Sequence, residues 1–158
     1  MDAVGVLLAQ YLPYAMAIGA VVFIIRFQGQ RARTLLLIEA ILAVVLSRGI
    51  ITELIRFFYH HPRPFAALGF ESLIPESGWS FPSGHAAAYF ALATILFLFN
   101  TEWGILYYGL AFINGLARIY AGVHWPLDIV GGIIVGTASA AIIHALLKKH
   151  REKILEPA

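Results

Sequence analysis

The sequence predicts an all-α integral membrane protein, built as a bundle of about five transmembrane helices. Hydrophobic residues make up 60% of the 158 positions, charged residues only 13%, and the mean hydropathy is +0.80. An ordinary soluble domain carries about twice that share of charge, and apolar runs of about 20 residues match the thickness of a bilayer. We therefore expect residues 1–158 to form a single membrane-embedded domain.

Hydrophobic runs and the polar breaks between them place the helices in order. The first run contains Pro13, which cannot donate to the helix ladder and predicts a kink. The third run is short for a membrane span and the fourth is marginal. Small residues on the third and fifth runs predict close helix packing. The five expected helices are Val4 to Ile25, Thr34 to Tyr59, Gly84 to Phe99, Gly104 to Ala121 and Pro126 to Leu147.

Charge and cysteine content exclude several classes of protein. The net charge of +2 comes mainly from the ends of the hydrophobic runs, so the clustered basic face that a nucleic-acid partner needs is missing. The absence of cysteine excludes disulfides and thiolate metal sites. The expected partners are the lipid bilayer and a membrane lipid, whereas the oligomeric state is left open.

The basic residues predict the orientation. One group follows the first helix and a second group follows the last, and with five spans both groups lie on one side of the membrane. By the positive-inside rule that side is cytoplasmic. The loops that follow the second and fourth helices then share the extracytoplasmic face of the cytoplasmic membrane. The two groups are Arg26, Arg31 and Arg33, and Lys148, Lys149, Arg151 and Lys153.

Three polar clusters stand where hydrophobic runs begin or end. Ionisable groups at membrane depth are costly, and they mark a functional site by default. All three clusters fall on the predicted outer side, although they are distant in sequence. Cations, imidazoles and a helix start together suit the binding and cleavage of a phosphate ester. The clusters are Arg56 with Arg63-Pro64, then Pro82-Ser83-Gly84-His85, and finally Arg118 with His124 and Asp128.

In these clusters the chain resembles the phosphatidic acid phosphatase type 2 superfamily. Six residues separate Arg56 from Arg63, five separate Arg118 from His124, and three separate His124 from Asp128, as in the three-part signature of that family. Two positions depart from the signature, because the family usually has Lys at position 56 and Ser at position 117, where this chain has Arg56 and Ala117. Arg keeps the charge with a different geometry. Within the superfamily, the chain is similar to bacterial undecaprenyl pyrophosphate phosphatases.

The resemblance implies a lipid phosphatase that works through a phosphohistidine intermediate. It implies His124 as the nucleophile, Asp128 as the group that holds the ring, and His85 as the acid and then the base. The contact between His124 and Asp128 is implied by the resemblance alone, since Trp125-Pro126 predicts a helix start between them. No cofactor and no metal are expected, because three arginines would repel a dication. The implied phosphate-binding residues are Arg56, Arg63, Ser83, Gly84 and Arg118.

Several alternatives remain open. The implied reaction converts undecaprenyl diphosphate to undecaprenyl phosphate, but phosphatidic acid, phosphatidylglycerol phosphate and other isoprenoid phosphates are also candidates. The preference between monophosphate and diphosphate is open as well. A different class is an anion transporter in which the arginines form the binding site. An inverted repeat, or a polar stripe that continues to the cytoplasmic side, would favour a carrier, and the sequence shows neither feature.

Other polar residues have no assigned role at this stage. His60 and His61 line the expected access to the site or are simply interfacial. Glu53 has the i,i+3 spacing for an ion pair with Arg56, and a catalytic role is the alternative. Two charged residues inside the second helix, Glu39 and Arg48, need internal partners or a wet cavity that the sequence does not identify.

Overall fold

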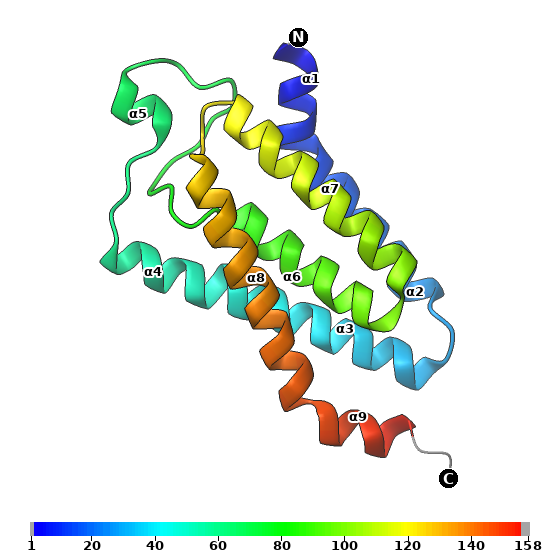
Figure 1. Ribbon diagram of the computed structural model, residues 1–158. Helices are drawn as coiled ribbons and strands as arrows, with labels where there is room; N and C mark the ends of the chain where they lie inside the picture. The colour runs from blue at the N-terminus through cyan, green and yellow to red at the C-terminus, as the bar shows by residue number, and fades with distance from the viewer. Residues whose placement is uncertain (1, 156–158) are drawn as a thin grey trace.

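The computed structural model describes residues 2–155, and every regular element in that range is a helix (Figure 1). Two long segments contain a π-helical insertion each, and the remaining helices follow singly. The first segment comprises α1 (Asp2–Val6), η1 (Leu7–Tyr11) and α2 (Leu12–Arg26). The second comprises α3 (Gln30–Val44), η2 (Val45–Ile51) and α4 (Thr52–Phe58). The others are α5 (Pro64–Leu68), α6 (Gly84–Phe99), α7 (Thr101–Tyr120), α8 (Pro126–Leu146) and α9 (Lys148–Leu155).

Three of the helical segments are long and apolar enough to cross a membrane. They are Asp2–Arg26, Gln30–Phe58 and Pro126–Leu146. The helix α6 is apolar but has only 16 residues. All five predicted helices are therefore present within a few residues of their expected ends, and the membrane-crossing length is confirmed for three of them.

The centre of the bundle is α6, which packs against α3, α7 and α8. Small residues allow α8 to approach it closely. A Cβ atom at Gly136 would lie 2.4 Å from the carbonyl oxygen of Ala87, and one at Gly132 would lie 2.6 Å from the Cβ of Ala86. Both alanines are buried. The close packing predicted from these small residues is confirmed, and it holds the second and third turns of α8 against the N-terminal half of α6.

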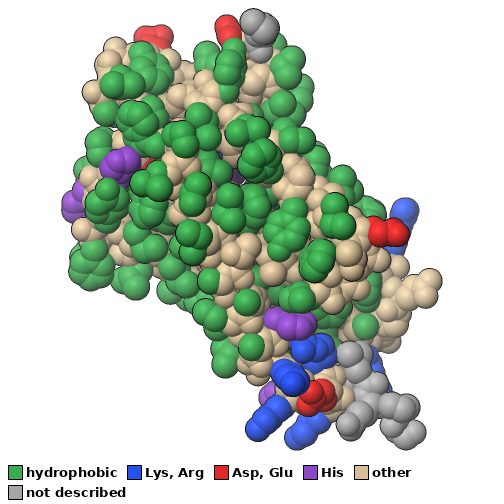
Figure 2. Space-filling view, viewed as in Figure 1, with side chains coloured by type: hydrophobic (Ala, Val, Ile, Leu, Met, Phe, Trp, Pro, Cys, Tyr) green, Lys and Arg blue, Asp and Glu red, His purple; other side chains and the backbone are tan. Residues whose placement is uncertain are grey.

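The outer surface of the bundle is largely apolar. Figure 2 shows hydrophobic side chains over most of the visible face, with Lys and Arg side chains gathered around α9. Ile18, Ile41 and Ile134 expose more than half of their surface, as residues that face lipid do. The most basic end of the molecule is therefore the end opposite α1 and α5 (Figure 1).

A π-helical turn precedes Pro13, the position at which the sequence predicts a kink. In that turn the N–H of Leu12 donates to the carbonyl of Leu7, so the register is i to i−5. Residue 13 would donate its N–H to the carbonyl of Leu8 in the π-helical register or to that of Ala9 in the α-helical register. Pro13 has no N–H, so it leaves these carbonyls without that donor. Asn114 supplies the donor instead, at 2.7 Å from the Leu8 oxygen and 3.3 Å from the Ala9 oxygen.

The buried carboxylate of Glu39 has its partners at the end of the bundle near α9. Its oxygens lie 2.7 Å from Nδ1 of His144 and 3.1 Å from Nη1 of Arg151. Glu39 is fully buried, so these contacts satisfy a charge that would otherwise be costly. They tie α3 to α8 and α9, far from the three polar clusters.

The substitution Gly136→Ala tests the contact between α6 and α8. We expect it to destabilise the protein by about 1–3 kcal/mol, since the new methyl group has no room against the α6 backbone. The matched control is Gly109→Ala on α7, where a Cβ atom meets nothing within 4 Å. Thermal unfolding in detergent measures both variants. Equal unfolding temperatures for the two variants would contradict the close packing.

Candidate active site

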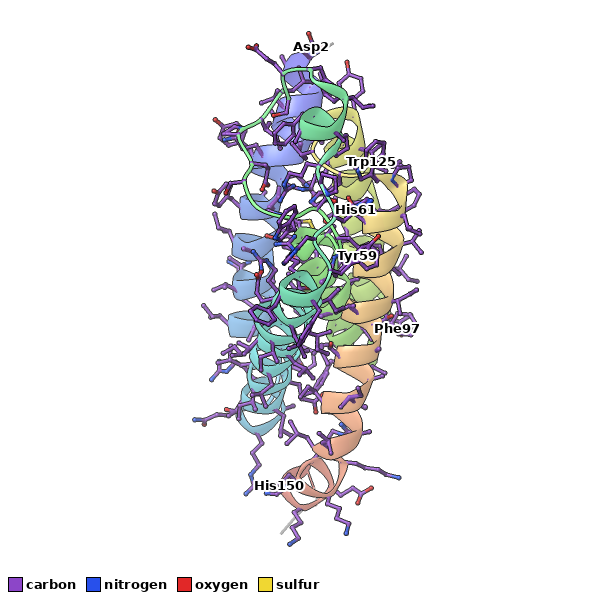
Figure 3. The ribbon with its side chains drawn as sticks, turned by 90° about the vertical axis from the view of Figure 1, so that its left-hand side faces the viewer. Asp2, Tyr59, His61, Phe97, Trp125 and His150 are labelled. Carbon is purple, nitrogen blue, oxygen red and sulfur yellow. The ribbon has the colours of Figure 1, made fainter. Side chains whose placement is uncertain are left out.

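The three polar clusters meet at one end of the bundle, where α4 and α7 end and α6 and α8 begin. Backbone groups of one cluster bind residues of another. Arg56 Nη2 donates to the carbonyl of Pro82 at 2.9 Å, and the N–H of Ser83 donates to the carbonyl of Asp128 at 2.9 Å. In Figure 3, Trp125, His61 and Tyr59 follow one another from the Asp2 end toward the middle of the molecule, and His150 lies at the opposite end.

His124 and Asp128 are in contact, but not as neighbours on one helical face. His124 precedes α8, which begins at Pro126 with Trp125 as its N-cap. Asp128 lies in the first turn, and its Oδ2 accepts the N–H of Trp125 at 2.8 Å. The same oxygen is 3.2 Å from His124 Nδ1. The helix start that made this contact doubtful from sequence is therefore what brings the two side chains together.

The neighbours of His124 select one tautomer of its ring. An ionised carboxylate only accepts hydrogen bonds, so Nδ1 next to Asp128 carries the proton. On the other side, Nη1 of Arg63 lies 3.5 Å from Nε2, and a guanidinium only donates. Nε2 therefore carries no proton, and its lone pair faces the Arg63 guanidinium. Burial lowers the pKa of His124 to about 4, against the opposing effect of its hydrogen bond with Asp128.

Two buried arginines share one carboxylate, that of Glu76. Its Oε2 lies 3.3 Å from Nη2 of Arg63, and its Oε1 accepts a hydrogen bond from Nη2 of Arg118. The side chains of Arg63 and Arg118 are 3% and 2% exposed. Burial opposes ionisation of Glu76, but the charges of Arg118 and Arg63 outweigh it and hold the pKa of that carboxyl below its usual value.

Backbone acceptors fix the same two guanidinium groups. Arg63 donates to the carbonyls of Val123 at 2.9 Å, Gly78 at 3.1 Å and Ser77 at 3.0 Å. Arg118 Nη1 donates to the Ala9 carbonyl at 3.3 Å, which is one of the two carbonyls before Pro13 that Asn114 also binds. Each arginine is thus held in place while part of its fork remains directed at a carboxylate.

His85 stands on the first turn of α6 beside a cavity of about 240 Å³, which Glu76, Tyr89 and Arg118 also line. Ser83 is the N-cap of this helix, and its Oγ accepts the N–H of Ala86 at 3.4 Å. The hydroxyl expected at a phosphate thus caps the helix here, as serine commonly does. Among residues 2–155 there is no group of three or more His, Asp or Glu side chains placed to hold a metal ion.

Sequence reasoning missed three participants. Glu76 has no assigned role in the sequence, because a loop carboxylate carries no spacing signal. Arg48 had no partner, yet it forms an ion pair with Glu53, which also lies 3.4 Å from Arg56 as the i,i+3 spacing predicted. His61 Nδ1 lies 2.9 Å from Ser80 Oγ and 3.6 Å from Asp128 Oδ1. His61 therefore lies beside the carboxylate that contacts His124, within the candidate site.

Residues 36–152 match the family model described as the PAP2 superfamily. The chain belongs to the PAP2 superfamily. This family is the one that the three sequence motifs resemble.

Similar proteins carry two kinds of name. The chain is 36% identical over 139 residues to a Bacillus licheniformis protein named bacitracin transport permease protein BcrC, covering 86% of this chain and 66% of that one. It is 35% identical over 89 residues to the undecaprenyl-diphosphatase BcrC of Bacillus subtilis, covering 54% and 45%. The chain thus spans about half to two thirds of the length of these curated relatives.

The fold also has a solved counterpart. The crystal structure of Aquifex aeolicus LpxE superposes with a TM-score of 0.73 at 30% identity, covering 91% of this chain and 85% of that one. Together with the three apolar segments of spanning length, these similarities identify a multi-pass membrane protein of the PAP2 superfamily.

Burial of neutral His124 predicts how stability depends on pH. Below pH 6.5, the ordinary pKa of a histidine, the His124 side chain is protonated in the unfolded chain. In the folded chain its pKa is about 4, so it stays neutral until the pH falls to that value. We therefore expect the unfolding temperature in detergent to fall between pH 6.5 and 4, and His124→Asn to reduce that fall. The control is His150→Asn, an exposed position on α9. An unchanged pH profile in the His124 variant would rule out this assignment.

Proposed function

We propose that residues 1–158 form one membrane-embedded phosphatase domain that hydrolyses the phosphate or diphosphate head group of a lipid through a phosphohistidine on His124. The specific reaction proposed is conversion of undecaprenyl diphosphate to undecaprenyl phosphate. The observation that carries the proposal is the environment of His124. Its Nδ1 binds a buried carboxylate, and its Nε2 faces a guanidinium that also contacts the Glu76 carboxylate.

In the first step, the Nε2 lone pair of His124 attacks phosphorus, and the bond from phosphorus to the leaving oxygen breaks. Asp128 stabilises the positive ring that results, because its Oδ2 lies next to the Nδ1 proton. His85 gives a proton to the leaving oxygen. Arg63 and Arg118 bind the equatorial oxygens with forked, charge-assisted hydrogen bonds in the position where they now hold Glu76.

In the second step, a water molecule attacks the phosphohistidine. His85, now neutral, takes the proton from that water, and the bond between phosphorus and Nε2 breaks. Inorganic phosphate leaves and His124 regains its lone pair. Every proton transfer is assigned to a side chain of the site, so the scheme needs neither a metal nor a cofactor. Added chelator is therefore expected to leave turnover unchanged.

Location supports a lipid substrate. The site lies at one end of an apolar bundle, so a lipid keeps its tail among hydrocarbon while its head group enters the cavity. The basic residues around α9 lie at the opposite end (Figure 2). By the positive-inside rule this supports a cytoplasmic membrane protein whose site faces outward.

Two alternatives are tested by phosphate release and by anion flux. Transport is suggested by the name of one relative, a bacitracin transport permease, and the arginines of this chain suit an anion as the cargo. Other lipid phosphates, including phosphatidic acid and phosphatidylglycerol phosphate, suit the same site, because the residues described bind a phosphate and not a tail. Purified protein in detergent should release phosphate from a panel of these lipids. Anion flux in vesicles without any phosphate release would instead establish a carrier.

The variant His124→Ala should lose at least about a hundredfold in turnover on every lipid that the wild type hydrolyses, since it removes the covalent catalyst. Phosphate release and trapping of an acid-labile phosphoprotein measure the effect. The control is His60→Ala, which removes an exposed imidazole stacked on Trp79 with ring centroids 4.7 Å apart. Near-normal turnover in a folded His124 variant would exclude it as the nucleophile.

The variant Glu76→Gln should bind inorganic phosphate more tightly than the wild type. The carboxylate competes for the two arginines, and a charge-assisted hydrogen bond contributes about 1.5–3 kcal/mol. We expect the inhibition constant of phosphate to fall about tenfold, measured with a lipid phosphate substrate. Glu71→Gln neutralises an exposed acid of the same loop and is the control. An unchanged inhibition constant would place the phosphate elsewhere.

A further inference from the structure

Arg48 lies in η2, inside the second apolar segment, where a charge is costly. Its side chain runs to the start of α6. A Cβ atom at Gly84 would come within 2.4 Å of Arg48 Nε and 2.9 Å of its Cζ. The guanidinium therefore lies directly on the glycine of Pro82-Ser83-Gly84-His85, and that glycine leaves the room for it.

Arg48 belongs to a second group of two arginines and one carboxylate. Glu53 Oε1 accepts hydrogen bonds from Nη1 of Arg48 and from Nη1 of Arg56, the latter at 3.4 Å. Arg56 in turn donates to the carbonyl of Pro82 at 2.9 Å. Both cations thus flank the backbone that leads to His85.

The two groups share a common design. Glu76 bridges Arg63 and Arg118, and Glu53 bridges Arg48 and Arg56. Both groups adjoin the first turn of α6, the first through the cavity that contains His85 and the second at Gly84. Arg48 and Glu53 differ from the first group in their access to solvent, whereas Arg56 is 12% exposed. Arg118 is 2% exposed, whereas the side chains of Arg48 and Glu53 are 43% and 50% exposed.

We propose that Arg48, together with Arg56, forms a second anion site that takes the lipid-proximal phosphate of a diphosphate head group. This inference rests on the proposed function. The terminal phosphate occupies the buried pair, Arg63 and Arg118, beside His124. The bond that breaks joins the terminal phosphorus to the bridging oxygen, which leaves on the lipid phosphate with a proton from His85.

The chemistry explains why a fourth cation matters for one substrate class. A diphosphate leaves a lipid phosphate, which carries negative charge next to the breaking bond, whereas a monophosphate leaves a neutral alcohol. A guanidinium placed at that leaving group stabilises the first reaction and is without effect on the second. Arg48 therefore acts as a specificity-determining residue for diphosphates.

The test compares a prenyl diphosphate with the prenyl monophosphate of the same tail. Arg48→Gln should lower kcat/KM for the diphosphate at least about tenfold and change that for the monophosphate less than about threefold. Arg48→Lys should restore part of the loss, because it returns the charge without the fork. Arg26→Gln, a loss of charge at the distant C-terminal end of α2, is the matched control.

A second variant keeps the test independent of the folding of Arg48→Gln. Glu53→Gln frees Arg48 and Arg56 from their shared carboxylate, so it should strengthen inhibition by inorganic pyrophosphate and leave inhibition by inorganic phosphate unchanged. Equal losses on both substrates in Arg48→Gln, or no pyrophosphate effect in Glu53→Gln, would overturn the second anion site while the phosphatase itself stands. A wild type that hydrolyses neither lipid would overturn the proposed function, and this inference with it.

Discussion

Buried positive charge at the first turn of α6 governs the architecture of this end of the molecule. The guanidinium groups of Arg63 and Arg118 are nearly inaccessible to solvent, and an unpaired buried charge costs far more than a surface one. Glu76 neutralises both of them. The chain from 69 to 83 is therefore held across the site by electrostatic attraction as well as by the backbone hydrogen bonds of Arg63. In the proposed function, a phosphate at the same position replaces the carboxylate as the negative charge between the two arginines.

Much of this arrangement could be predicted from sequence, and the reason lies in spacing. The helices follow from apolar run length, because a bilayer sets the length of a span. The convergence of Arg56, Ser83 and Asp128 follows from an alternation of helices, which returns every second loop to the same side. Close contact between α6 and α8 was foreseen from small residues, and the clearances at Gly132 and Gly136 explain it.

The remaining features have no periodic signal. Glu76 lies in a loop whose path depends on what its backbone binds, so no spacing reveals its two partners. The contact between His124 and Asp128 arises at a helix N-cap, and the spacing of the two residues does not reveal it. Arg48 and Glu39 both need partners, and their position inside one helix does not indicate them. Arg48 pairs with Glu53 beside Gly84, whereas Glu39 binds residues of α8 and α9. In each case the missing information is which distant backbone segment lies alongside.

The proline in the first helix has a consequence for how the molecule is assembled. Because Pro13 cannot bond to the preceding turn, the Leu8 and Ala9 carbonyls rely on Asn114 and Arg118, which are synthesised about a hundred residues later. Until α7 arrives in the bilayer, those acceptors lack their final donors, and unsatisfied backbone groups are costly in lipid. The N-terminal helix therefore obtains its missing donors only when α7 packs against it, and the same contact positions Arg118 of the candidate site.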